Sequence, residues 1–172
     1  MSTNNVINRI AIGLEKITTE SIPTKVLNIA KSCIIDTCGV AIAGSTTSSA
    51  KNIHAVVTES FRDGNCTVLG RTNTLNVFGA ALANGVSAHA LDFDDNCYAG
   101  IVHGSAVVLP SVLAVAQENS SSGNELLYSF IAGLEAQFAV AKAFSNDIYD
   151  RGWWTTSILG VIGSAAGACK LL

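Results

Sequence analysis

Apolar residues recur at helical spacing along most of the chain. From residue 26 to residue 41 they line one side of a long helix that starts near residues 21–23 and ends at residues 43–44: Val26, Leu27, Ile29, Ala30, Cys33, Ile34, Val40 and Ala41. The same spacing predicts further helices over residues 5–17, 50–61, 75–91, 105–118, 124–145 and 155–172. Short polar or glycine-containing connections separate them, so we predict an all-α fold, a multi-helix bundle.

Polar residues before several of these segments are typical of helix caps. Ser21 precedes Pro23, which fits a cap followed by proline in the first turn. Residues 72–74 could cap the helix that follows them, and Thr155 or Thr156 the last one. Residues 66–70 are the only strand-like run, and they are too few to change the fold class.

The composition suggests that part of the surface is covered. Hydrophobic residues make up 49% of the 172 residues and charged residues only 13%, about half the usual charged fraction. The last helical pattern stops on two leucines, with no capping glycine and no polar tail. We therefore expect residues 1–172 to form one incomplete domain of a longer protein, with an exposed apolar patch that favours a homodimer or other self-association.

Several classes of partner are disfavoured. The net charge of −3 without a basic block argues against nucleic acid. Residues 72–91, 96–117 and 152–169 carry no charge and are long enough to span a bilayer, but polar residues interrupt each, so no membrane insertion is expected. Five cysteines without a C-x-x-C pair, and no visible signal sequence, predict reduced thiols and a cytoplasmic protein.

The densest group of chemically active residues lies between His89 and Ser105. Asp92, Asp94 and Asp95 follow a predicted helix end, where acidic residues oppose the helix dipole, which favours a functional reason for them. His103 precedes the predicted helix at Ser105 and can exchange protons near neutral pH. Backbone N–H groups at that helix start could hold a substrate carboxylate beside it. A structural role for this histidine remains the alternative.

A metal site is the rival interpretation of the same segment. His89, Asp92, Asp94, Asp95 and His103 are all potential ligands. Their spacing matches no compact metal motif, and three aspartates so close in sequence cannot all point to one place. We therefore predict no metal.

A second unusual segment follows at residues 151–156. Two adjacent tryptophans, Trp153 and Trp154, are costly to expose, and Arg151 could bind a carboxylate with two hydrogen bonds. A hydrophobic plug with an unrelated surface arginine is the alternative. The glycines nearby fit close helix packing: Gly152, Gly160, Gly163 and Gly167.

Four segments together resemble the MmgE/PrpD family. They are VLG at 68–70, ALANGVSAHALDFDD at 81–95, HGSAVVLPSVLAVAQ at 103–117 and RGWWTTSILGVIGSAAGACKLL at 151–172. The family includes 2-methylcitrate dehydratase, cis-aconitate decarboxylase and iminodisuccinate epimerase. The resemblance implies a large helical domain with a smaller α/β lid domain, dimers, and proton transfer beside a carboxylate without metal or other cofactor.

The resemblance also implies roles for individual residues. Family active-site positions fall on Asp92, Asn96 and His103, where His103 would exchange the proton and Asp92 would hold the neighbouring polar network. Arg151 and Trp154 are further substrate-binding candidates. The family often has proline at the position of Gly104, and a second histidine at the position of Trp154, so the chemistry could differ here. The lid domain is absent from these residues.

Two functions follow from these observations. The first is the N-terminal part of a metal-independent lyase or isomerase, similar to 2-methylcitrate dehydratase, that acts on a small di- or tricarboxylate. The second is a non-catalytic truncated fragment that only self-associates or binds a partner. If the chain is part of a lyase or isomerase, we predict that His103→Ala lowers kcat by about 10²–10⁴ with the fold intact. The nucleotide sequence downstream of Leu172 would discriminate between the two functions.

Overall fold

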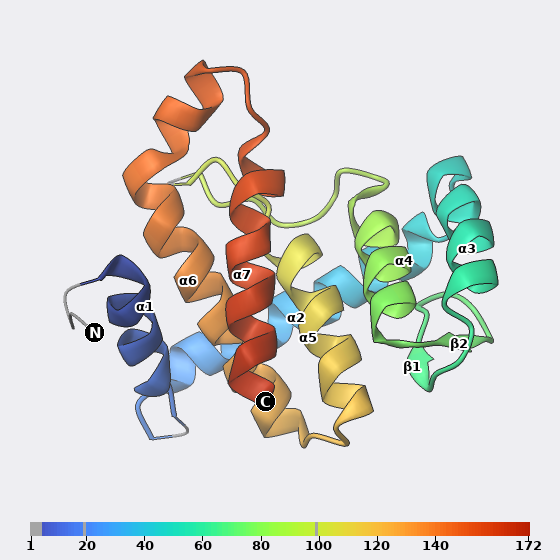
Figure 1. The fold of residues 1–172 in the computed structure, drawn as a ribbon, viewed down its shortest axis with the longest axis horizontal. Coiled ribbons are helices and arrows are strands. Elements are labelled where there is room, and N and C mark those ends of the chain that lie inside the picture. Colours follow the sequence, from blue (N-terminus) through green and yellow to red (C-terminus); the bar gives the residue numbers. More distant parts are fainter. Residues whose placement is uncertain (1–4, 19, 99) are drawn as a thin grey trace.

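The chain folds into α-helices joined by short connections, and helices account for about 70% of it (Figure 1). The structure is a computed structural model that describes residues 5–18, 20–98 and 100–172. The elements are α1 (Val6–Glu15), α2 (Thr24–Gly44), α3 (Ser48–Ser60), β1 (Cys66–Thr67), β2 (Thr74–Leu75), α4 (Val77–His89), α5 (Ser105–Glu118), α6 (Gly123–Asp150) and α7 (Thr155–Leu171). The predicted all-α class is confirmed.

The main core forms where α5 and α6 meet, and α2 crosses behind both (Figure 1). Its buried side chains are Ala30 from α2, Val108, Leu109 and Val112 from α5, and Leu127, Phe130 and Ile131 from α6. Burial of this apolar surface supplies most of the stabilising free energy of such a domain. The helix α5 lies between α4 and α7 and contacts both, so it is the central helix around which the site is built.

Glycines allow α6 and α7 to approach closely. A Cβ on Gly133 would lie 2.6 Å from the side chain of Val108 and 2.8 Å from the carbonyl oxygen of Gly163. A Cβ on Gly163 or Gly167 would likewise lie 3.0 Å or less from a neighbouring residue. The predicted packing role is therefore confirmed for the α7 glycines. Gly152 differs, because it forms a turn at φ 82° with nothing near its missing Cβ.

A two-stranded antiparallel sheet closes the end of the bundle near α3 and α4. Cys66 pairs with Leu75 and Thr67 with Thr74. The sequence predicted one strand over residues 66–70, but β1 ends at Thr67, because the buried amide of Asn84 takes over the pairing. Its Oδ1 accepts the N–H of Leu69 and its Nδ2 donates to the carbonyl of Thr67, both at 2.8 Å.

Several predicted helix ends were wrong. The N-cap of α2 is Pro23, without a side-chain cap, while the Ser21 hydroxyl bonds to Thr18 in the preceding turn. Asn76 caps α4 in place of residues 72–74. The helix α6 continues to Asp150, five residues beyond the predicted 145, because no proline or glycine lies between residue 145 and Gly152.

One helix, α2, is long and apolar enough to cross a membrane by length and composition. It has 21 residues with a mean hydropathy of 1.5 over its most apolar window, 17% of which is buried. The sequence analysis had considered three other, uncharged stretches as possible membrane spans. The helices in those stretches, α4, α5 and α7, are shorter than α2. Because α2 packs against α4, α5 and α6, it also fits the role of a helix that supports the bundle.

Candidate active site

The candidate site lies at one end of the bundle, where α4 ends and α5 and α7 begin (Figure 1). His89 is the last residue of α4, and His103 lies two residues before α5. Asp92 and Asp94 belong to the connection between these helices. One side-chain atom from each of these four residues lies within 4.8 Å of the others, so the fold assembles them into one cluster.

The buried carboxylate of Asp94 is the centre of this cluster. Its side chain is 0% exposed, compared with 12% for His103 and 41% for His89. Nδ1 of His89 lies 3.0 Å from Oδ1 and 3.1 Å from Oδ2 of Asp94, which makes a hydrogen bond in which the imidazole N–H donates. The two imidazole rings meet edge to face, with centroids 4.8 Å apart. A buried carboxylate needs such partners, since burying an unpaired charge is costly.

The contact between His103 and Asp94 differs from that of His89. Nδ1 of His103 lies 3.0 Å from Oδ2 of Asp94, within ion-pair distance. However, this buried nitrogen makes no hydrogen bond of acceptable geometry with any described residue. The contact between His103 and Asp94 is therefore an electrostatic attraction without a hydrogen bond.

Asp92 approaches the other nitrogen of the same ring. Its Oδ1 lies 3.9 Å from Nε2 of His103, and its side chain is 79% exposed. The backbone of Asp92 has φ 54°, a left-handed conformation that aspartate tolerates better than most residues. Asp92 thus faces solvent beside His103, whereas Asp94 lies beneath both histidines.

Asp95 serves the start of α5. Its Oδ1 accepts the backbone N–H of Ser105 at 2.9 Å, and its Oδ2 accepts the Ser105 hydroxyl. A carboxylate at a helix N-terminus is favourable for the helix dipole, so the sequence interpretation that these aspartates are badly placed for stability was wrong for Asp95. Asp95 also binds a backbone N–H group that the sequence analysis had proposed for a substrate carboxylate.

Asp95 also affects a nearby cysteine. Burial raises the pKa of the Cys33 thiol, and the negative charge of Asp95 raises it further.

Two threonines at the start of α7 hold the backbone that carries His103. Oγ1 of Thr156 accepts the N–H of His103 at 3.1 Å, and the Thr155 hydroxyl donates to the carbonyl of Ile101. Gln137 from α6 donates to the carbonyl of His103 at 3.3 Å. The prediction that Thr155 or Thr156 caps α7 was wrong, because Trp154 is the N-cap and no side chain caps the helix.

A hollow of about 590 Å³ borders the cluster, between α4, α5 and α7. His89, Trp154 and Thr156 line one end of it. The remaining wall consists mainly of small or apolar residues, including Leu82, Gly85, Val107, Pro110, Gly160 and Val161. Trp154 is 56% exposed, so part of its apolar ring surface in the lining is open to solvent.

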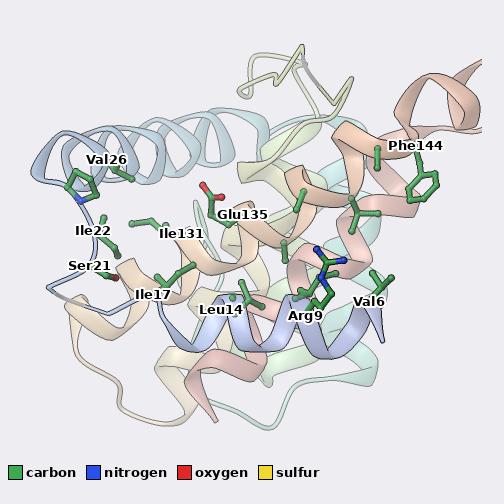
Figure 2. Close-up of a pocket in the computed structure, with 17 residues that line it drawn as sticks. Val6, Arg9, Leu14, Ile17, Ser21, Ile22, Val26, Ile131, Glu135 and Phe144 are labelled. Atoms are coloured by element: carbon green, nitrogen blue, oxygen red, sulfur yellow. The ribbon is translucent and has the colours of Figure 1, made fainter. Parts of the chain in front are cut away.

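A larger hollow of about 760 Å³ lies elsewhere, between α1, the start of α2 and α6 (Figure 2). Its walls are almost entirely apolar, and Arg9 and Glu135 are the charged residues that line it. None of the four clustered residues belongs to its lining. Of these two hollows, the smaller one is the one that reaches the cluster, through His89.

The structure places the other sequence candidates differently. Asn96 is exposed in the connection between α4 and α5. Arg151 is the exposed C-cap of α6. Within the part of the chain described, neither makes an ion pair or a side-chain hydrogen bond with His89, Asp94 or His103. The sequence missed the central position of Asp94 and the closeness of His89, because their distance depends on how α4 and α5 pack.

The cluster has two chemical capabilities. An imidazole between a buried carboxylate and an exposed one can accept and return a proton. Two imidazoles and two carboxylates are also ligands that a transition-metal ion accepts. Four of the five potential ligands named from the sequence thus lie together, and Asp95 is the one that points away, toward Ser105.

Comparisons with known proteins find relatives that match over most of this chain. The chain is 29% identical to a cis-aconitate decarboxylase from Aspergillus terreus over 98% of its length and 36% of the relative. It is 30% identical to the cis-aconitate decarboxylase of Homo sapiens, over 100% of the chain and 37% of the relative. A cis-aconitate decarboxylase-like protein from Aspergillus oryzae is 27% identical over 98% of the chain and 36% of the relative.

The chain therefore spans about a third of the length of these relatives. The match includes the segments from which the resemblance was drawn, because the family model described as the MmgE/PrpD N-terminal domain covers residues 8–172. On this evidence the chain belongs to the MmgE/PrpD family.

Proposed function

We propose that this chain is the proton-transfer part of a metal-independent lyase that acts on a small polycarboxylate, with cis-aconitate or a close analogue as the substrate class. The observation that carries the proposal is the position of His103, between the buried carboxylate of Asp94 and the exposed carboxylate of Asp92. The names of the relatives, cis-aconitate decarboxylases, support a lyase rather than an isomerase, and decarboxylation rather than dehydration, as our choice of reaction.

The proposed roles follow from the exposure of each group. His103 exchanges the proton, because its Nε2 lies on the side of Asp92, whose side chain is largely exposed. Asp94 holds the ring in place from the buried side, with Oδ2 3.0 Å from Nδ1. When a carboxylate leaves as CO₂, its bonding electron pair stays on the substrate, and a proton must meet that pair. A protonated His103 can supply it and recover a proton afterwards.

The electrostatics of the cluster set a further requirement. A di- or tricarboxylate is strongly negative, and Asp92 and Asp94 are negative too, so substrate binding needs positive groups besides the histidines. Arg151 is the sequence candidate, but it lies exposed at the end of α6. We propose that additional cations come from residues beyond this chain or from a second copy, which agrees with a homodimer. Cytoplasmic location and independence from any cofactor belong to the same proposal.

The test is turnover of cis-aconitate, measured as release of CO₂, for the chain and for a version extended by the downstream reading frame. The sequence suggested His103→Ala, but that side chain is mostly buried against Asp94 and its removal would also destabilise the fold. His103→Gln keeps the size, and it should lower kcat by about 10²–10⁴. The matched control is His54→Gln, because His54 lies on α3, outside the cluster, where it bonds to Asn73.

Near-normal turnover in a folded His103→Gln protein would contradict the assignment. Loss of activity after thorough chelation would contradict metal independence. If His103→Gln loses thermal stability but retains its turnover, His103 is only a structural partner of the aspartates.

A second function has its own observation. Large apolar side chains are exposed on α4, on α7 and just before α7, among them Phe78, Leu82, Trp153, Ile158 and Val161. A non-catalytic fragment that self-associates through such residues would show concentration-dependent sedimentation and no turnover with any polycarboxylate.

A further inference from the structure

The charges around Asp94 leave room for one more cation. Among the described residues, the ion pairs of Asp94 involve only His89 and His103, and no lysine or arginine reaches it. Asp92 adds a second carboxylate, beside the ring of His103. With neutral imidazoles the cluster carries two negative charges, one of them fully buried, and such a charge favours binding of a proton or a metal cation.

The distances fit a small transition-metal ion. Nδ1 of His89 lies 3.1 Å, and Nδ1 of His103 lies 3.0 Å, from the same oxygen, Oδ2 of Asp94. In a tetrahedral zinc site with bonds of about 2.0–2.1 Å, two ligand atoms are about 3.3 Å apart. Two edges of one triangular face, those that meet at Oδ2 of Asp94, therefore already have nearly the tetrahedral spacing. Nδ1 of His103 has no competing hydrogen bond of acceptable geometry.

Asp92 is the candidate for the fourth ligand, and its Oδ1 now lies 3.9 Å from Nε2 of His103, whereas Asp94 lies beside Nδ1. One atom from each of the four residues lies within 4.8 Å of the others, so closing the set needs a movement of about 1.5 Å to reach that tetrahedral spacing. The side chains that would move are exposed, 79% for Asp92 and 41% for His89. Asp94 and His103, which are mostly buried, would keep their places.

We infer that His89, Asp92, Asp94 and His103 form a binding site for one divalent transition-metal ion of the zinc class, and that such an ion inhibits the proposed reaction. Imidazole nitrogens favour zinc over magnesium or calcium, which prefer oxygen ligands. With the ion on Nδ1, the imidazole of His103 carries its proton on Nε2 and has no free lone pair with which to recover a proton there. Only the inhibition rests on the proposed function, whereas binding stands without it.

The test is a titration of the metal-free, reduced 172-residue chain with Co²⁺, whose visible absorption reports tetrahedral coordination. We expect one ion per chain and displacement of Co²⁺ by one equivalent of Zn²⁺. Asp94→Asn and His89→Gln should each weaken binding by about 10–100-fold or more. His54→Gln should leave the affinity unchanged, and so should Cys97→Ser and Cys169→Ser, because neither thiol belongs to the ligand set.

The helical circular dichroism signal identifies variants that fail to fold. If Asp94→Asn fails to fold, His89→Gln decides, since its half-exposed side chain adds little to the core. Three results would overturn the proposed metal site. They are weak visible absorption of the Co²⁺ complex, an unchanged metal affinity in His89→Gln, and loss of metal binding in Cys97→Ser. Where turnover is present, Zn²⁺ should abolish it and chelation restore it, and unaltered turnover at saturating Zn²⁺ would overturn the inhibition. Because the titration needs no substrate, absence of turnover leaves its result standing.

Discussion

Oγ1 of Thr156 accepts the backbone N–H of His103 at 3.1 Å, although 53 positions separate the two residues in the sequence. The first turn of α7 therefore fixes the candidate base. The position of α7 depends in turn on its glycine contacts with α6, which leave no space for a Cβ at Gly133. A defect in helix packing should consequently be transmitted to the site.

Thr156→Val should lower the free energy of unfolding by about 1–3 kcal/mol. Valine keeps the shape of threonine but cannot accept the N–H of His103, which then lacks its partner. Urea unfolding measures the change. Ser157→Ala is the control, because its exposed hydroxyl bonds only to the carbonyl of Trp154 in the same turn, and it should stay within about 0.5 kcal/mol of the unmodified chain. Equal values for both variants would show that the Thr156 contact is unimportant.

Gly133→Ala should destabilise the chain by about 1–3 kcal/mol or more, because the added methyl group collides with Val108 and the Gly163 carbonyl. Gly39→Ala should have the opposite sign. Gly39 lies exposed inside α2 with nothing near its missing Cβ, so alanine should stabilise the helix by roughly 0.5–1 kcal/mol. Thermal unfolding of the two variants gives the comparison, and destabilisation by Gly39→Ala would contradict it.

The cysteines should differ in their reaction with iodoacetamide. Burial raises the pKa of the Cys33, Cys38 and Cys66 thiols, and the thiolate is the reactive form. At pH 7–8 these three should react slowly in the folded chain, whereas the exposed Cys169 should react first. Peptide mass spectrometry after short labelling measures the order. Labelling in urea should remove the difference, and early modification of Cys66 would contradict the described burial.

Stability should depend on pH through the capping box of α6. The N–H and hydroxyl of Ser122 bond to the Glu125 carboxylate and lower its pKa below the usual 4.5. Because the folded-state pKa is the lower one, this stabilisation is complete above about pH 4.5 and is lost as the pH falls through the folded-state value. The urea midpoint of Glu125→Gln should therefore fall less between pH 5 and pH 3 than that of the unmodified chain.

Glu59→Gln, which removes an exposed carboxylate near the end of α3, is the matched control for this pH series. It should follow the unmodified chain through the acid range. A Glu125→Gln curve parallel to both would mean that the capping box makes no pH-dependent contribution.

Helical spacing of apolar residues sufficed to predict the positions of all the long helices, and the motif around His103 sufficed to indicate the family. Both are local properties, since periodicity and short motifs are encoded within a few turns of chain. The helix caps were predicted less well. Asn76 and Trp154 are the N-caps in place of the expected residues. A hydroxyl group can bond to any suitable group that folding brings near it, as the Thr156 hydroxyl does with the N–H of His103.

The sequence by itself therefore determined the helices, the class of the fold and which polar residues were available for chemistry. Only the tertiary structure decided that Asp94 lies buried between His89 and His103, that Asp95 turns away to Ser105, and that Arg151 stays apart. Adjacent residues in an irregular connection can point in opposite directions, as Asp94 and Asp95 do. Their direction is set by which neighbours can compensate a carboxylate charge. Those neighbours are His89 at the end of α4, and His103 and Ser105 at the start of α5, which only packing brings together.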